Sequence, residues 1–293
     1  MLVGMIDDDE EIDAGWYGSI LRAFSERPEL DFIGGPYRPV WAETPPDWIP
    51  QDYLAVLGEV DTGSGEQDYG THFAGILKGG NAVIRRQALL RAGPYAEYLG
   101  PAGAARLLSC EDEEMYWRLL KSGARGQYLP SLVVHHHVSA ARLTHGYFRR
   151  WCFWRGVSRG LMDRAHPLPV RYLAGVPRFL YGSAARGLTQ VVARKLDGRT
   201  ATLSDELKGW DLAGYLWGRH IYTLARFSPV RSRRRIPTSW PERLQPQAAA
   251  PDEPGWNSSC YFDEGHGGQS TSDHHPTGRL RLGEHRRASS PTL

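Results

Sequence analysis

The chain has 293 residues, 41% of them hydrophobic, and a formal net charge of +2. Its length and apolar content are enough for one main domain with a sizeable core. The small net charge argues against binding by bulk attraction to phosphates, so we expect no nucleic-acid partner. Three widely spaced cysteines exclude a disulfide scaffold and a C-x-x-C zinc site. Because no apolar run reaches membrane-spanning length and no signal peptide is evident, we expect a cytoplasmic location.

The first third of the chain predicts strands alternating with helices. The apolar run 2–6 indicates a strand, and the helical spacing of large apolar residues over 16–24 predicts a helix that ends before Pro28. The sequence LDFIGG, at 30–35, predicts a second strand, and NAVIRRQALLRAG, at 81–93, a strand end followed by a short helix. This alternation indicates an α/β layer fold, in which ligands bind beyond the carboxyl ends of strands.

The middle of the chain predicts one more helix and one more strand. SCEDEEMYWRLLKSG, at 109–123, has Ser109 as a candidate N-cap, acids in the first turn and a glycine after the last turn, which together predict a helix. QYLPSLVVHHH, at 127–137, predicts a single strand that ends in histidines. Alternation along that strand would place His136 on the face opposite its two neighbours.

Two acidic groups are candidates for chemistry. Asp7, Asp8 and Asp9 follow the first predicted strand. Adjacent carboxylates repel one another, and a divalent cation with oxygen ligands would neutralise them. Glu111 and Asp112 begin a predicted helix, where backbone N–H groups keep a carboxylate ionised and oriented, as a general base requires. An acidic loop and ordinary first-turn acids are the alternatives, and each pattern by itself leaves both interpretations open.

The order of these elements resembles the family 2 glycosyltransferases with a GT-A fold. The resemblance runs from about residue 2 to residue 160 and is carried in order by DDD, GGPYRPVW, GGNAVIRR, EDEEMYWRLLKSG and RLTHGYFRRWCFWRG. It implies a GT-A (Rossmann-like) mixed sheet with flanking helices, truncated at its N-terminus. It also implies transfer of a sugar, with inversion, from a nucleotide-sugar donor to a saccharide or lipid-linked acceptor, as in synthesis of a cell-envelope polysaccharide.

The resemblance also implies a role for particular residues. The aspartates match the D-x-D motif, which holds the donor diphosphate through a divalent cation, Mn²⁺ or Mg²⁺. The implied metal ligands are Asp7, Asp9 and His136. The implied catalytic residues are Asp112, as the base on the acceptor hydroxyl, and Glu111 beside it. The implied donor or substrate contacts are Asp8, Gly80, Asn81, Arg150 and Trp151. Processive relatives carry Q-x-x-R-W, but Tyr147 stands where the glutamine would be, so we expect transfer of a single sugar.

Three regions are expected along the chain. Residues 1–140 match part of a GT-A domain, 141–227 form a basic and aromatic helical segment, and 228–293 are rich in Pro, Gly, Ser, Arg and His, which predicts a disordered tail. Family members place a nucleotide-binding half before the acidic motif, and the resemblance therefore implies a chain with impaired activity on its own.

Two further interpretations stay open. The mixture of apolar residues with arginines in 168–196 suits a membrane surface, so a non-catalytic protein that binds a membrane or another protein is the main alternative. Peripheral contact at the inner face of the membrane is also compatible with a transferase, as is a helical pair packed against the core. A metal hydrolase that uses the aspartates and histidines is a weaker interpretation, because successive residues of a strand cannot face one ion.

Overall fold

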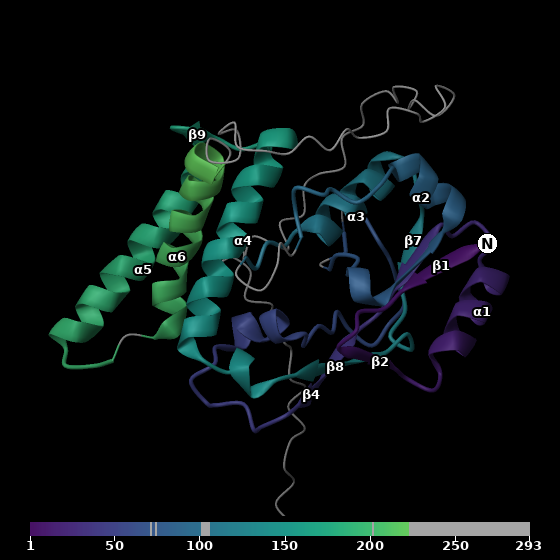
Figure 1. The fold of residues 1–293 in the computed structure, drawn as a ribbon, viewed down its shortest axis with the longest axis horizontal. Helices are drawn as coiled ribbons and strands as arrows, with labels where there is room; N and C mark the ends of the chain where they lie inside the picture. The colour runs from purple at the N-terminus through teal and green to yellow at the C-terminus, as the bar shows by residue number, and fades with distance from the viewer. Residues whose placement is uncertain (71, 74, 101–105, 201, 223–293) are drawn as a thin grey trace, which may run out of the picture.

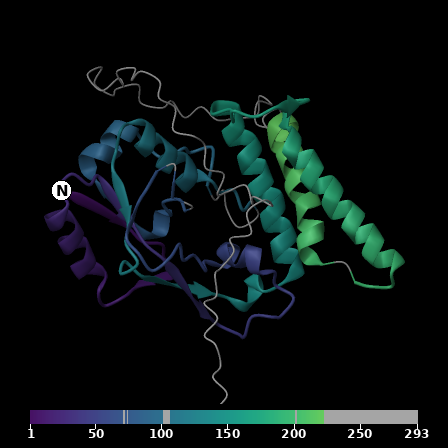
Figure 2. The same ribbon diagram turned by 180° about the vertical axis from the view of Figure 1, so that it is seen from behind.

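The structure combines a mixed α/β core with a layer of long helices beside it. The computed structural model describes residues 1–70, 72–73, 75–100, 106–200 and 202–222. The predicted disordered tail, 228–293, lies outside the described residues. Figures 1 and 2 show the strands of the two larger sheets and the shorter helices on one side of the molecule, and the long helices with β9 (Tyr172–Leu173) on the other. The predicted α/β class with mixed sheets and flanking helices is confirmed.

A five-stranded sheet forms the centre of the core. Its order is β1 (Leu2–Met5), β6 (Ala82–Arg85), β3 (Phe32–Gly34), β7 (Gly126–Tyr128) and β5 (Gln67–Asp68), and only the β3–β7 pair is parallel. Side chains alternate between the two faces, so that Phe32 and Ile84 pack under α2 (Arg86–Ala92) and α3 (Glu111–Lys121), while Ile33 and Val83 pack under α1 (Trp16–Glu26). Helices therefore cover both faces of this sheet.

A second, three-stranded sheet extends from the first. Its order is β2 (Glu10–Ile12), β8 (Val134–Val138) and β4 (Tyr37–Trp41). The prediction of one strand over 127–137 is wrong: the chain turns at Pro130, where the Leu132 N–H donates to the Leu129 carbonyl at 3.0 Å, and β7 and β8 belong to different sheets. Within β8, His136 is buried and its two neighbours are not, as the alternation predicts. The three aspartates form the turn between the two sheets.

The helical layer consists of α4 (His145–Ala165), α5 (Arg178–Leu196) and α6 (Leu203–Leu216), the last continued by a π-helix (Trp217–Tyr222). The α6 helix lies between α4 and α5 (Figure 1). Glycines allow close approach, since a Cβ at Gly214 would lie 1.9 Å from the Phe153 carbonyl oxygen of α4. Between them, Asp211 of α6 accepts from Arg155 at 3.2 Å and from Arg159 at 2.7 Å. In the described residues, no helix has both the length and the apolar character needed to span a bilayer.

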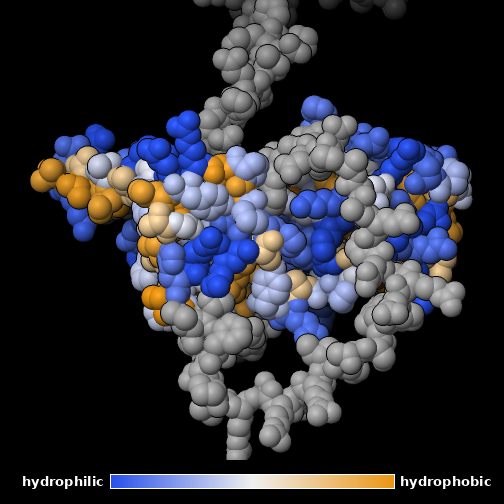
Figure 3. All heavy atoms as spheres, turned by 90° about the horizontal axis from the view of Figure 1, so that it is seen from above, coloured by the Kyte–Doolittle hydropathy of each residue, from blue (hydrophilic) through white to orange (hydrophobic). Residues whose placement is uncertain are grey.

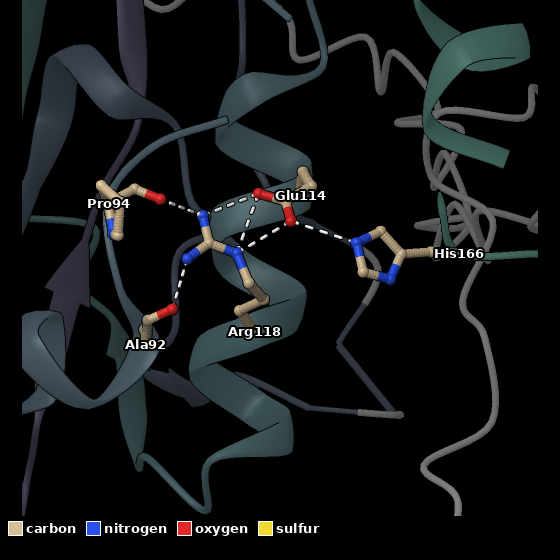
Figure 4. Close-up of polar contacts among 5 residues, drawn as sticks. All are labelled: Ala92, Pro94, Glu114, Arg118 and His166. Carbon is tan, nitrogen blue, oxygen red and sulfur yellow. Dashed lines mark hydrogen bonds and ion pairs between the residues drawn. The ribbon is translucent and has the colours of Figure 1, made fainter. Parts of the chain in front are cut away.

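A polar contact ties this layer to the core. Glu114 of α3 accepts from Arg118 Nε at 2.8 Å, and its Oε1 lies 3.2 Å from Nε2 of His166, the residue that follows α4 (Figure 4). The Arg118 guanidinium also donates to the carbonyls of Ala92 and Pro94. The first turn of α3 is thus held from both sides, by the loop after α2 and by the end of α4.

The shorter elements connect these layers. They are the 3-10 helices Gln51–Leu57, Gly79–Asn81 and Ala140–Arg142 and the two-stranded hairpin of β9 (Tyr172–Leu173) and β10 (Val176–Pro177). Gly79–Asn81 precedes β6, which runs antiparallel to β1. The start of β6 therefore lies beside the end of β1, where the aspartates follow.

Candidate active site

The turn after β1 gathers three carboxylates. One oxygen from each of Asp7, Asp9 and Glu10 lies within 4.8 Å of the others. The turn is closed by the Glu10 N–H, which donates to the Asp7 carbonyl, and by the Asp7 N–H, which donates to Glu10 Oε2 at 3.0 Å. Three convergent carboxylates fit a hard divalent cation such as Mg²⁺ or Mn²⁺. Sequence reasoning missed Glu10, because only this turn brings its carboxylate back toward Asp7.

The first turn of α3 brings Asp112 to the same place. Asp112 accepts a hydrogen bond from the backbone N–H of Gly79, and a Cβ at Gly79 would lie 2.2 Å from Asp112 Oδ1. A Cβ at Gly80 would lie 2.3 Å from Glu10 Oε2. Because neither glycine has a side chain, the carboxylates of Asp112 and Glu10 can both lie against the backbone of Gly79 and Gly80.

The prediction of Ser109 as the N-cap of α3 is wrong. The cap residue is Cys110, which makes no side-chain cap hydrogen bond and has a left-handed backbone with φ of 74°. The Ser109 N–H instead donates to Ser158 Oγ of α4 at 2.9 Å. A non-glycine residue in this conformation is strained and persists only where surrounding contacts impose it, which is common beside functional sites. Here it directly precedes Glu111 and Asp112.

Burial and mutual repulsion hold protons on these acids. Burial first, then repulsion from Asp112 and the neighbouring aspartates, raises the pKa of Asp7. Burial raises the pKa of Glu10 to about 7, and burial followed by repulsion from Asp112 raises the pKa of Glu111 to about 7. Burial also raises the pKa of Asp112, against the Gly79 hydrogen bond and the charge of Lys78. The cluster therefore favours any bound positive charge.

His136 approaches the cluster from β8, opposite Glu10 in the strand register. Its Nδ1 lies 3.0 Å from the Leu57 carbonyl, so Nδ1 donates and Nε2 is left to accept. Arg142 fills that position: one guanidinium nitrogen lies 2.9 Å from His136 Nε2 and the other donates to Asp9 Oδ2 at 2.8 Å. Arg142 is a second residue that sequence reasoning missed. It is the counter-charge that His136 and Asp9 share.

The remaining predicted contacts occupy several positions. Asp8 is exposed in the β1–β2 turn. Asn81 is fully buried under the site, accepting from Trp16 Nε1 at 2.9 Å and donating to the carbonyls of Pro36 and Leu132. It holds the layers together at the point where Gly80 meets Glu10. Its contact with a donor sugar stays a prediction.

Arg150 and Trp151, two of the predicted donor or substrate contacts, lie near the start of α4 in different surroundings. Burial raises the pKa of Tyr147, and the charges that act on it next are those of Arg142, Arg150 and Asp9, so this turn lies within electrostatic reach of the cluster. Trp151 is half-buried, with the Arg155 guanidinium 5.0 Å from its ring centroid. Donor or substrate contact by either residue stays a prediction.

The geometry so far defines a mixed α/β domain with an acidic cluster between its two sheets, and one curated protein is similar to it in sequence. The chain is 24% identical over 168 residues to a glucosyl-dolichyl phosphate glucuronosyltransferase of Haloferax volcanii, an alignment that covers 57% of this chain and 52% of that protein. The predicted resemblance to glycosyltransferases is thereby confirmed. The chain spans about half the length of this curated relative.

Of the two other comparisons, one finds no match and the other finds a distant structural similarity. No family model matches the chain. Among solved structures, a crystal structure of GalNAc-T7 with UDP, GalNAc and Mn²⁺ is similar at 10% sequence identity and a TM-score of 0.32, over 78% of this chain and 41% of that one.

Proposed function

We propose that this chain is a GT-A-type family 2 glycosyltransferase that transfers a single sugar, with inversion, from a nucleotide-sugar to an acceptor hydroxyl. The observation that carries the proposal is the convergence of two acidic groups far apart in sequence, the Asp7–Glu10 turn and Asp112. Arg142 pairs with Asp9, but burial still raises the pKa of Asp7 and of Asp112, which a structural set with full counter-charges would not show. The relative described above supports the reaction class.

Asp7, Asp9 and Glu10 would hold a divalent cation. His136 lies next to Asp9, with its Nε2 3.4 Å from Asp9 Oδ2. Such a cation, when bound, supplies charge stabilisation for a departing diphosphate. The hydrogen bonds of the turn orient Glu10, and Arg142 occupies Asp9 and His136 while no cation is bound.

Asp112 is the proposed base. Its raised pKa makes the carboxylate a better proton acceptor than an ordinary aspartate, and the Gly79 N–H fixes its direction. Attack by an acceptor hydroxyl whose proton passes to Asp112, on the face opposite the leaving group, gives inversion. Glu111 lies beside it: its Oε2 is buried with no hydrogen-bond partner among the described residues, and burial followed by repulsion from Asp112 raises its own pKa to about 7.

The name of the relative suggests the first substrates to test. We propose a lipid-linked saccharide as the acceptor and nucleotide-linked glucuronic acid as the first donor, at the cytoplasmic face of a membrane. A soluble saccharide and other nucleotide-sugars are the comparison substrates.

The proposal is tested by measuring transfer with Mn²⁺ or Mg²⁺ and after chelation. We expect Asp112→Asn to lower kcat by about 10²- to 10⁴-fold, because it removes the base. Glu11→Gln, at an exposed acid on the same strand as Glu10, is the matched control and should leave the rate within about twofold. Transfer that survives both chelation and Asp112→Asn, or the absence of any cation-dependent binding of a nucleotide-sugar, would overturn the proposal.

A further inference from the structure

The outermost helix, α5, turns only one face toward the protein. Its buried residues are Leu180 and Gly187, both on the side that meets α6. The contact at Gly187 is close, because a Cβ there would lie 2.5 Å from the Asp205 carbonyl oxygen. Figures 1 and 2 show α5 at the edge of the molecule farthest from the β-sheets. The rest of its surface faces solvent.

That open surface carries an apolar stripe. Ala185, Leu188, Val192 and Leu196 recur at helical spacings of three and four, which places them on one face. The large members are strongly exposed: Leu188 at 65%, Val192 at 48% and Leu196 at 82%. Seen from above in Figure 3, hydrophobic side chains gather between hydrophilic ones at the end of the molecule that α5 forms.

The charges on this helix are all of one sign. Its ionisable side chains other than Tyr181 are Arg178, Arg186, Arg194 and Lys195, and it contains no Asp or Glu. Arg194 pairs with Asp205 at 3.4 Å, and Arg186 and Lys195 lie on opposite sides of the stripe, about 120° and about 60° from its centre. An exposed apolar stripe between basic residues matches a bilayer that contains anionic lipids, whose acyl region takes the stripe and whose headgroups take the cations.

The neighbouring elements share this character. Most of the exposed large hydrophobic side chains in the described part of the chain lie between Val170 and Ile221, among them Leu173 of the β9–β10 hairpin and Trp210 and Trp217. Exposed tryptophans are typical of the interface between lipid and water. By contrast, the exposed residues Tyr17 and Leu21 of α1 lie beside the Arg22–Glu26 ion pair.

We propose that α5 is a membrane-docking helix that lies in the surface of an anionic bilayer, with Leu188, Val192 and Leu196 inserted and Arg186 and Lys195 at the headgroups. This inference goes beyond the proposed function, because it needs neither the cation nor transfer.

The test is co-sedimentation of the full chain with vesicles of phosphatidylcholine, with and without about one third phosphatidylglycerol, at about 0.1 M salt. We expect binding only to the anionic vesicles. Leu188→Gln, Val192→Gln and Leu196→Gln together should weaken it at least about tenfold, because burying these side chains supplies the apolar contribution. Arg186→Gln with Lys195→Gln should weaken it up to about 30-fold, at about 1 kcal/mol for each basic residue near the surface.

Matched control variants distinguish binding through this surface from non-specific adsorption to vesicles. Tyr17→Gln with Leu21→Gln removes equally exposed apolar groups from α1, and Arg86→Gln removes an exposed cation from α2; both should bind vesicles like the unmodified chain. Circular dichroism checks that each variant is folded. The proposal would be overturned if the α5 variants bound vesicles as well as the unmodified chain, or if the α1 variant lost binding together with them. It would also be overturned if the unmodified chain did not bind anionic vesicles. Because no step involves transfer, a catalytically inactive Asp112→Asn chain should bind vesicles normally.

Discussion

Two regions of this molecule bury charge in opposite ways. In the helical layer, burial acts to raise the pKa of Asp211, but Arg159 and Arg155 outweigh it and lower that pKa. At the edge of the sheets, burial raises the pKa of Asp7, Glu10, Glu111 and Asp112, and the acids repel one another. Asp211 has two cationic partners among the described residues, whereas the acids at the sheet edge have raised pKa values that an added positive charge would lower. This difference separates a structural ion network from the proposed site.

The largest effect on stability is expected in the helical layer. Asp211→Ala leaves two buried guanidiniums without their shared carboxylate and should lower the free energy of unfolding by about 3–5 kcal/mol. Glu206→Gln, at the half-exposed partner of Arg149, should cost less than about 1 kcal/mol. Asp112→Asn should cost nothing or stabilise the cation-free chain, because it removes a repelling charge. Urea unfolding of the three variants measures this. If Asp112→Asn lowered the free energy of unfolding as much as Asp211→Ala does, the two regions would not differ in how they bury charge.

A smaller effect is expected from cation and pH at the acidic cluster. A carboxyl whose pKa is raised by folding holds its proton better in the folded chain, so cation-free stability falls as pH rises from the ordinary value of 4.5 to about 7 and then levels off. Mn²⁺ at about 100 times its Kd should stabilise the chain by about 2.7 kcal/mol above pH 7, and much less near pH 5, where protons compete.

Thermal unfolding at several pH values, with and without Mn²⁺, measures this dependence. Asp7→Asn with Asp9→Asn should abolish the stabilisation by Mn²⁺, whereas Glu11→Gln should keep it. Equal stabilisation at pH 5 and pH 8 would show that the ion binds elsewhere.

The smallest effect is expected at Arg142, whose guanidinium pairs with Asp9 Oδ2 at 2.8 Å. Removing a partly exposed partner frees Asp9 and His136, so Arg142→Ala should raise Mn²⁺ affinity about two- to fivefold, at roughly 0.5–1 kcal/mol. Arg149→Ala, which breaks a similar pair on α4, should leave the affinity unchanged. Isothermal titration calorimetry of both variants measures the Mn²⁺ affinity. A weaker affinity of Arg142→Ala than of the unmodified chain would mean that the guanidinium orients Asp9 rather than competing with the ion.

Local patterns predicted most of the core elements. The end of β1, the whole of α1 and the acidic first turn of α3 follow from apolar spacing and helix signals. The meeting of the β1–β2 turn with α3 was implied only by the resemblance to family 2 glycosyltransferases, since no local pattern brings the two segments together. The break at Pro130 was missed because apolar residues continue through it, and only pairing with two different sheets separates β7 from β8.

The missed site residues depend on contacts distant in sequence. Glu10 enters the site through a tight turn, which a run of acids does not reveal. Arg142 reaches Asp9 from the 3-10 helix after β8, 133 residues away in sequence, and nothing in its local sequence marks it. The left-handed backbone of Cys110 is likewise imposed from outside, since isolated non-glycine residues avoid it.

The contacts at Gly79 and Gly80 have a consequence for how this protein can change over generations. A methyl group at either position would meet the mobile end of a carboxylate rather than the backbone, so it would displace Asp112 or Glu10 without preventing the chain from folding. Under the proposed function, substitutions there would yield proteins that fold and accumulate normally but transfer sugar poorly. Substitutions in the Asp211 network would instead be removed because the protein fails to fold.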